Sequence, residues 1–468
     1  MKVFNRFLIL SLVVLFVAGA ADVDAKRRKL QPGAAISSAK IELLSGEEER
    51  INTAIALLDS LFMNWGPHAE GLYWMAQIQV DLMKKRSDLK EKLPYVEALV
   101  AYSDSLHLCC GNKKIKSSYR KDCDEYMADV DSLKVLFWRE FYNAGVKQID
   151  EVSRLMTDIT NESDSSALEY YQTRLDAQID SCKDNMALAI AIDSTDPRTY
   201  IGLASAYEKT KDFEQSREWL LKALDKSEDR SQVLLQVAYN YIQSNKYCEA
   251  IPYFREYVDT ITANDEVMAN PDNIPSVVGT MYNLTICYNN CKHYDEGYEL
   301  SQRILMYDPE NAEVLQGAGR YHNQMAREAN DSANVYKESE PEKFQQWSDQ
   351  KQIRFDSARV FLKKAFEVDP DNKSIADEYG VTCAILRKFD EAAVAFARIS
   401  EIDPADARNW TSLGDCYLSI KEFEKAAEAY EHAVELEPDN KSVIETLRDL
   451  HKQLGNTARV AELDKRLK

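Results

Sequence analysis

Nine cysteines and six histidines are the residues of this chain whose chemistry depends most on spacing. Two groups stand out, one with the pattern C-x3-C-x-H and one that combines a histidine with three cysteines. The first consists of Cys287, Cys291 and His293, and the second of His107, Cys109, Cys110 and Cys123. Thiolates and imidazoles so close in sequence can bind a metal ion, but neither spacing matches a common zinc site. We therefore expect disulfides or plain packing at these cysteines, and we predict no metal site.

Catalytic motifs are missing from the sequence. It contains no glycine-rich phosphate loop, no HExxH zinc signature, no GxSxG nucleophile elbow and no CxxCH haem site. The 78 acidic residues show no pattern that separates general acid–base pairs from solvated helix faces. We predict a protein that is not an enzyme, with no catalytic residues and no cofactor.

A repeat near the carboxyl end supplies the frame in which the other residues can be placed. Segments 373–406 and 407–440 align in register without gaps. The matching pairs are Tyr379 with Leu413, Gly380 with Gly414, Ala392 with Ala426, Phe396 with Tyr430 and Pro404 with Pro438. A fixed period of about 34 residues predicts stacked helical units rather than one closed core.

These residues resemble the tetratricopeptide repeat, whose pattern has a bulky residue at position 4, small residues at positions 8 and 20, an aromatic residue at position 24 and proline at position 32. The second segment carries the pattern at Trp410, Leu413, Gly414, Tyr417, Ala426, Tyr430, Ala433 and Pro438. The resemblance implies an all-α fold, namely a right-handed α-solenoid of stacked antiparallel helix pairs with about nine or ten repeats.

Weaker copies of the pattern cover most of the remaining chain. Regular units begin at Pro197, Ser231 and Val278, and an earlier second helix is expected to begin at Pro94. Two units carry polar insertions between their halves, which predict extended helical hairpins. The predicted order is a signal peptide at 1–20, a flexible segment at 21–34, degenerate helical repeats at 35–134, an extended repeat at 135–196, regular repeats at 197–311, an extended repeat at 312–372, two regular repeats at 373–440 and capping helices at 441–468.

The amino-terminal residues predict export. Lys2 and Arg6 precede an apolar run at 7–17, and small residues follow at 18–20, as in a secretory signal peptide. The run is short for a bilayer core of ~30 Å, although an uncleaved anchor is the alternative. Because no cysteine precedes Cys109, we do not expect a lipoprotein. We predict a bacterial periplasm or cell envelope location, with membrane contact only through this segment.

The charge balance disfavours nucleic acid as a partner. The formal net charge is -20, and the one basic run is the short stretch 26–29 near the start. Nucleic-acid binding depends on basic surfaces that neutralise phosphates. A lone basic run of this kind is typical of a solvated tail.

Two disulfides follow as hypotheses from the repeat frame and from export, because exported proteins meet an oxidising environment. Cys248 lies early on a second helix and Cys291 lies late on the next first helix, and the resemblance implies that these helices are antiparallel neighbours. We hypothesise that Cys248 pairs with Cys291 and that Cys110 pairs with Cys123. Three other cysteines are expected to be buried, namely Cys182, Cys383 and Cys416.

A concave surface is the candidate binding site that the resemblance implies. In tetratricopeptide proteins, positions 2, 5, 9, 12 and 13 of the first helices line such a surface. The middle units place there Tyr239, Gln243, Tyr282, Asn289, Asn290, Gln316, Arg320, Asn323 and Gln324. Amides beside aromatic rings suit an extended peptide backbone or a sugar, and the alternative is that they are merely solvated. His322, at the packing position 11, is expected in the core.

The resulting functional hypothesis is an exported, non-enzymatic scaffold that binds proteins of the cell envelope through its concave face and its two projecting hairpins. The hairpins are equally explained as insertions that repeat arrays tolerate. The alternative function is a polysaccharide- or glycan-binding solenoid of the envelope. The sequence indicates no particular oligomeric state.

Overall fold

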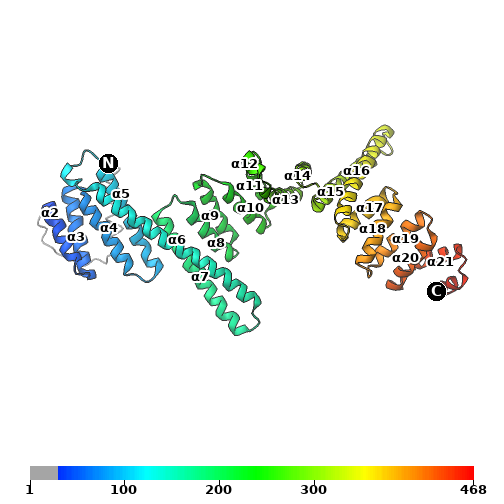
Figure 1. Cartoon of the computed structure of the whole chain (residues 1–468), viewed down its shortest axis with the longest axis horizontal. Helices are drawn as coiled ribbons and strands as arrows, with labels where there is room; N and C mark the ends of the chain where they lie inside the picture. The colour runs from blue at the N-terminus through cyan, green and yellow to red at the C-terminus, as the bar shows by residue number, and fades with distance from the viewer. Residues whose placement is uncertain (1–29, 468) are drawn as a thin grey trace. The chain divides into compact units, whose positions relative to one another are not determined.

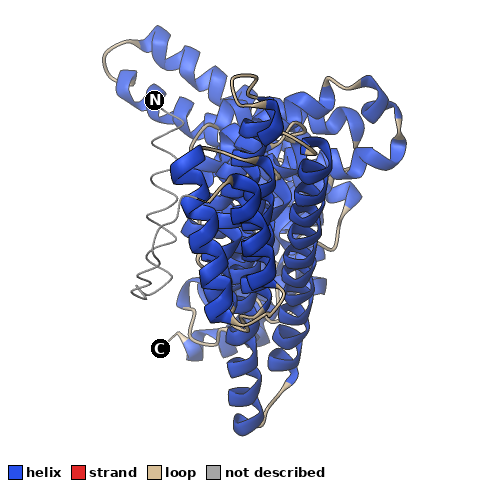
Figure 2. Cartoon of the chain, turned by 90° about the vertical axis from the view of Figure 1, so that its left-hand side faces the viewer, coloured by secondary structure: helices blue, strands red, loops and turns tan. Residues whose placement is uncertain are grey.

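The structure is a computed structural model that describes residues 30–467. The predicted signal peptide at 1–20 and most of the predicted flexible segment lie outside these residues. Everything described is helix or loop, without a strand (Figure 2). The predicted all-α fold of stacked helix pairs is therefore confirmed. The chain divides into two compact units, Met1–Asn245 and Lys246–Lys468.

The first unit consists of helices that pack as consecutive pairs, with the labels shown in Figure 1. They are α2 (Pro32–Leu43), α3 (Glu48–Trp65), α4 (Ala69–Lys84), α5 (Leu89–Gly111), the 3₁₀ turn η1 (Ser117–Tyr119), α6 (Cys123–Asn161), α7 (Ser165–Ile192), α8 (Pro197–Lys209), α9 (Phe213–Lys226) and α10 (Ser231–Gln243). The long pair α6 and α7 forms the first predicted hairpin. Its far end has a buried cluster of its own, made of Val152, Leu155, Leu175 and Ile179.

The second unit repeats the same arrangement. It contains α11 (Tyr247–Thr262), α12 (Asp265–Ala269), the 3₁₀ turn η2 (Pro271–Asn273), α13 (Ile274–Asn290), α14 (Tyr294–Tyr307), α15 (Ala312–Tyr336), α16 (Pro341–Val368), α17 (Lys373–Ile385), α18 (Phe389–Ile402), α19 (Ala407–Ser419), α20 (Phe423–Leu436), α21 (Lys441–Gln453) and α22 (Thr457–Arg466). The second predicted hairpin is formed by α15 and α16, with its corner just before Pro341.

Five of the first helices, α8, α15, α17, α19 and α21, begin at a side chain that caps them. The side chains of Asp196, Asn311 and Asn372 accept hydrogen bonds from backbone N–H groups in the first turns of α8, α15 and α17. These N–H groups have no partner inside the helix, so a short oxygen-bearing side chain at this point contributes about 1 kcal/mol. The loop that ends one repeat therefore starts the next repeat at a defined residue.

The short turn inside each regular repeat has one recurring backbone geometry. Position 15 is left-handed in six repeats, at Lys211, Asn245, Lys292, Arg387, Lys421 and Gly455. In five of these turns the next N–H donates to the carbonyl of position 11, for example Lys388 to Cys383 at 2.8 Å and Glu422 to Tyr417 at 2.9 Å. This six-residue closure satisfies a carbonyl at the helix end and fixes the direction of the second helix. Five of the six residues are not glycine, so sequence patterns did not reveal it.

Small residues allow the two helices of a repeat to approach closely. A Cβ atom added at Gly414 would lie 2.8 Å from a ring carbon of Tyr430, and one at Gly319 would lie 2.6 Å from Leu362. Tyr430 is almost fully buried, at 1% exposure. The small residue predicted at position 8 and the aromatic residue predicted at position 24 therefore contact each other.

Three predicted boundaries need correction. Helix α5 begins at Leu89 rather than Pro94, because Asp88 caps it, and Pro94 lies inside the helix. Helix α13 begins at Ile274, four residues before Val278, since a proline in the first turn removes no intrahelical hydrogen bond. Pro32 likewise starts α2 within the segment predicted to be flexible to residue 34. In addition, α6 is continuous from Cys123, so the boundary between 134 and 135 falls inside one helix.

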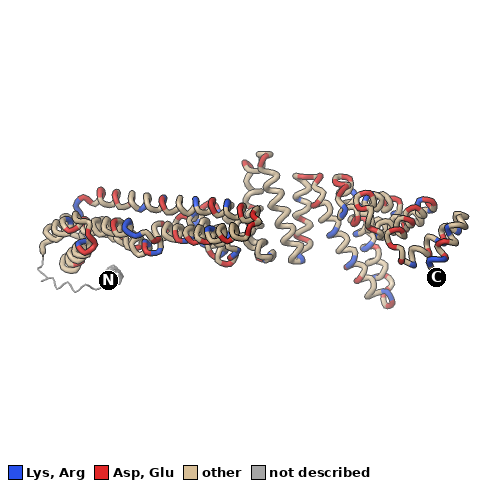
Figure 3. The backbone as a smooth tube through the Cα atoms, turned by 90° about the horizontal axis from the view of Figure 1, so that it is seen from below, with Lys and Arg blue, Asp and Glu red and all other residues tan. Residues whose placement is uncertain are grey.

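Acidic and basic residues are scattered along the helices of each unit (Figure 3). In residues 30–467 no helix combines the length and the apolar character that crossing a lipid bilayer requires.

Replacing Gly414 with alanine is expected to destabilise the repeat formed by α19 and α20. Alanine favours a helix over glycine by about 1 kcal/mol, but the overpacked contact with Tyr430 costs about 1–3 kcal/mol. The matched control is Gly279→Ala, where nothing lies within 4 Å of the added methyl group. For Gly414→Ala, hydrogen exchange should show less protection of α19 and α20, and urea unfolding of the full chain should show a lower free energy of unfolding. For Gly279→Ala, the free energy of unfolding should rise slightly. Equal gains for both variants would contradict the close contact.

Candidate binding groove

A groove with a volume of about 640 Å³ runs along α13, α15 and α17 of the second unit. These are the first helices of three successive repeats, and α14 and α16 contribute its floor. Its lining includes aromatic, aliphatic, amide and charged side chains, which are Tyr282, Thr285, Ile286, Asn289, Tyr294, Ser301, Glu313, Val314, Gly317, Arg320, Tyr321, Asn323, Gln324, Arg327, Phe355, Asp377, Glu378, Val381, Thr382 and Ile385. The volume is in the range of sites that bind small molecules or short chain segments.

The groove brings together part of the predicted concave set. Its lining includes Tyr282, Asn289, Arg320, Asn323 and Gln324. The remaining predicted residues lie elsewhere. Gln316 is buried beneath the groove, at 7% exposure. Asn290 lies outside the lining, and its amide donates to the backbone carbonyl of Ile286 at 2.9 Å. Tyr239 and Gln243 belong to α10 in the first unit.

Arg320 is held by a carboxylate from the next repeat. Its Nε donates to Oε2 of Glu378 at 2.9 Å and its Nη2 donates to Oε1 at 2.5 Å, which gives a two-pronged ion pair between α15 and α17. The hydrogen bonds with Glu378 raise the pKa of Arg320. Such forked geometry is stronger and more directional than a single contact. Arg320 was predicted to contact a ligand, but its first role is to join two repeats.

Two predicted amides also join α15 to α17. The Nε2 atom of Gln316 donates to Ser374 at 3.0 Å and to Glu378 at 2.9 Å. The Nδ2 atom of Asn323 donates to the hydroxyl of Thr382 at 3.0 Å. Buried polar groups need such partners, because leaving one unpaired costs about 1–3 kcal/mol. Both amides are therefore structural, and Asn323 also lines the groove.

Several charged and aliphatic residues of the groove were not predicted. Asp377, Val381 and Ile385 occupy positions 5, 9 and 13 of the repeat that begins at Lys373, so the positional rule would have found them had it been applied to this repeat too. Val381 and Ile385 are 43% and 53% exposed. Arg327 lies beyond the rule, because it follows from the extra length of α15.

The groove also contains ionisable groups whose pKa is raised by burial. Shielding from water, followed by repulsion from Glu378, raises the pKa of Asp377. Burial, and then a hydrogen bond to Glu313, raises the pKa of Tyr282. Burial raises the pKa of Tyr321 to about 12, helped by the hydrogen bond that its hydroxyl donates to Asp295 at 2.7 Å. The tyrosines are therefore neutral hydrogen-bonding groups at physiological pH.

His322 lies in the core behind the groove, as predicted. Its ring stacks on Phe361 with 5.5 Å between ring centres, and its Nε2 is 3.1 Å from the hydroxyl of Tyr298. Burial, with a smaller effect of the nearby Arg354, lowers the pKa of His322 to about 4. The side chain is neutral at pH 7 and packs as part of the apolar floor.

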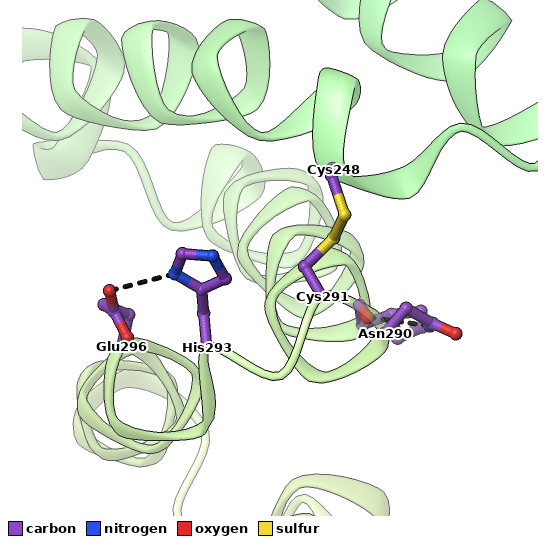
Figure 4. Close-up of a disulfide and its surroundings, with 6 residues drawn as sticks. Cys248, Asn290, Cys291, His293 and Glu296 are labelled. Carbon is purple, nitrogen blue, oxygen red and sulfur yellow. Dashed lines mark hydrogen bonds and ion pairs between the residues drawn. A yellow bond between two sulfur atoms is a disulfide. The ribbon is translucent and has the colours of Figure 1, made fainter.

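Both cysteine groups of the sequence contain a disulfide. Cys248 of α11 is bonded to Cys291 at the end of α13, and His293 faces Glu296 with Nδ1 3.2 Å from a carboxylate oxygen (Figure 4). Cys110 is bonded to Cys123 across the loop that follows α5. These are the two pairings that the sequence raised as hypotheses. Since Cys291 is used in a disulfide, the C-x3-C-x-H pattern does not offer three metal ligands.

The cysteines outside the disulfides are buried. They are Cys109, Cys182, Cys287, Cys383 and Cys416. Burial raises the pKa of the Cys109, Cys287 and Cys416 thiols to about 11, which keeps them protonated and poorly reactive. Their role is packing, which agrees with the prediction for Cys182, Cys383 and Cys416.

Comparison with known proteins finds the same repeat by other means. The tetratricopeptide repeat family matches residues 407–440 and residues 197–229, which are the helix pairs α19 and α20 and α8 and α9. No curated protein matches the chain.

Solved structures resemble parts of the chain at low sequence identity. The crystal structure of YrrB, described as a TPR protein with an unusual peptide-binding site, is 17% identical over 56% of this chain and 96% of its own, with a TM-score of 0.28. MamA from Desulfovibrio magneticus RS-1 is 16% identical over 41% of this chain and 92% of its own, with a TM-score of 0.28. Another MamA crystal structure is 17% identical over 41% and 89%, with a TM-score of 0.30.

The buried His322 predicts one component of the pH dependence of stability. The folded state keeps the imidazole neutral down to a pKa of about 4, whereas the unfolded chain protonates it near 6.5. Its contribution is therefore fully present above pH 6.5 and declines as the pH falls towards 4, by up to about 3 kcal/mol. Urea unfolding at pH 7 and pH 4.5 should show a smaller pH effect in His322→Gln than in the parent protein. The control His432→Gln changes an exposed histidine and should keep the parental pH effect; if His322→Gln keeps it as well, the assignment is wrong.

Proposed function

We propose that this chain, which contains tetratricopeptide repeats, is a non-enzymatic scaffold that binds protein partners in the groove along α13, α15 and α17. The observation that carries the proposal is the composition of this groove. Aliphatic and aromatic side chains lie beside amides and charges on three parallel first helices. An extended protein segment presents the matching features, since it has apolar side chains alternating with backbone donors and acceptors.

Binding would use a surface that is already ordered. The groove walls are held by the contacts of Arg320, Gln316 and Asn323 with α17, so little conformational freedom remains to be lost. A preorganised site avoids part of the ordering cost of association, which is about 0.5–1.5 kcal/mol for each side chain that must be immobilised. Moderate contacts along several repeats can then add up to a useful affinity. The two long hairpins extend from the same kind of repeat and offer further contact surface.

We further propose that the protein is exported and works in a bacterial cell envelope. Two features support this proposal: the leader-like residues 1–20 and the two disulfides, Cys110–Cys123 and Cys248–Cys291. Structural disulfides persist in oxidising compartments and are rare where thiols are kept reduced. Proteins of the same compartment are then the expected partners.

Site-specific photo-crosslinking tests the groove. A photoreactive residue at Val381, on the groove wall, is expected to capture a discrete protein in intact cells. The matched control is Val394 on α18, which is 60% exposed and lies outside the groove. Capture at Val381 but not at Val394 is the expected result. Equal capture at both positions, or none at Val381, would contradict a binding groove. Retardation in a native gel that contains polysaccharide, lost in Val381→Lys, would instead favour the glycan-binding alternative.

Mass analysis of the protein isolated from its native cells tests export. We expect the mature chain to begin after residue 20. Alkylation of the denatured, unreduced protein should modify five of the nine cysteines and leave the four disulfide cysteines unmodified. An intact leader together with nine modified cysteines would overturn the proposal of an exported protein.

A further inference from the structure

The groove has an uneven distribution of charges along its length. Near the amino-terminal ends of its helices lie the carboxylates of Glu313 on α15 and Asp377 on α17. Towards the carboxyl-terminal end of α15 lies the guanidinium of Arg327. Asn323 of α15 is hydrogen-bonded to Thr382 of α17, so Arg327, one turn further along α15, is level with the end of α17. The two kinds of charge are therefore at opposite ends of the groove.

These charges are not used by the fold. Among residues 30–467, Arg327 forms no ion pair or hydrogen bond through its side chain, and Glu313 and Asp377 form no ion pair, although the nearby Arg408 and Lys373 act to lower the pKa of Asp377. Glu313 accepts a hydrogen bond from the neutral Tyr282, which leaves its charge in place. Arg320, midway between the two ends, differs because Glu378 neutralises it. What remains is an acidic end, a neutral middle and a basic end.

The wall of the groove that leads to the basic end is apolar, because α17 places Val381 between the two ends and ends at Ile385, level with Arg327. Val381 and Ile385 lie one helical turn apart on α17, and both are about half exposed. The acidic and basic ends are 14 residues apart along α15, which corresponds to about 21 Å at 1.5 Å per helical residue. An extended chain advances about 3.3 Å per residue, so about six residues of a bound segment would span this distance.

We propose that the groove selects an extended protein segment with a basic group at one end and an acidic group about six residues away, separated by aliphatic side chains. The basic group would lie between Glu313 and Asp377, the acidic group would pair with Arg327, and the aliphatic side chains would contact Val381 and Ile385. This inference rests on the proposed function, because it specifies the chemistry of the segment that the same groove binds. Matching charges at two separated points also fixes the direction in which the segment lies.

Binding of defined peptides to the full-length protein tests the charge pattern. The probes are fluorescent heptapeptides with blocked ends and a leucine-rich centre, carrying Lys and Asp, Lys and Lys, Asp and Asp, or Ser and Ser at their two ends. Fluorescence anisotropy at low salt should show the tightest binding for the Lys and Asp peptide, by about three- to tenfold over the Ser and Ser peptide. The difference should shrink as salt is added, because exposed charges are screened.

Variants of the basic end distinguish a specific pairing from a general charge effect. Arg327→Glu should make the Lys and Lys peptide the preferred probe. Lys364→Glu is the matched control, since it makes the same change in net charge at an exposed site on α16 outside the groove, and it should leave the order of preference unchanged. An order of preference that is unchanged in Arg327→Glu, or equally changed in Lys364→Glu, would overturn the inference.

The outcome also separates this inference from the proposed function. If all four peptides bind equally and Val381→Lys abolishes their binding, the groove binds protein segments but the charge pattern is wrong. If crosslinking at Val381 captures no protein, the proposed function fails, and the inference fails with it.

Discussion

The close approach of two helices at a small residue is the constraint on which this structure depends. Tyr430 packs against Gly414 within its own repeat, and the same ring belongs to the buried cluster that contains Leu447 of the following repeat. Leu362 likewise packs over Gly319 and joins the cluster of the next pair. A single large side chain thus links the two helices of a repeat and links that repeat to its neighbour. Because no repeat can bury these side chains alone, each repeat is stabilised by its neighbours.

Much of this architecture could be predicted from the sequence, because the residues that make the contact recur at a fixed period. The positions of Gly414 and Tyr430 follow directly from that recurrence, and the two long hairpins follow from the polar insertions that interrupt it. The turn geometry could not be predicted in the same way, since Lys211, Arg387 and Lys421 take the left-handed conformation that usually marks glycine. The start of α5 was missed because Pro94 appeared to be a first residue, whereas the cap at Asp88 outweighs it.

The candidate site was only partly predictable, for a physical reason. The positional rule states which side chains face the concave surface, but it does not state what else they contact. Gln316 and Arg320 of α15 both donate hydrogen bonds to Glu378 of α17. Two residues predicted to contact a ligand therefore contact a neighbouring repeat instead. Neighbouring first helices are close enough for long polar side chains to meet. Residues at these positions therefore either join two repeats or remain available to contact a ligand. Only the structure shows which residues belong to which group.

Charged residues of the groove differ in the same way, because some are paired within the fold and others are not. A forked pair such as Arg320 with Glu378 holds two helices in register, so it belongs to the scaffold. An exposed charge such as Arg327 costs the fold little when unpaired, because water solvates it and a surface ion pair would contribute only about 0–1 kcal/mol. Such charges affect binding when a partner excludes that water. An unmatched charge then makes the free energy of binding less favourable, whereas a matched charge does not. The paired residues thus hold the helices together, and in the function that we propose the unpaired residues select the partner.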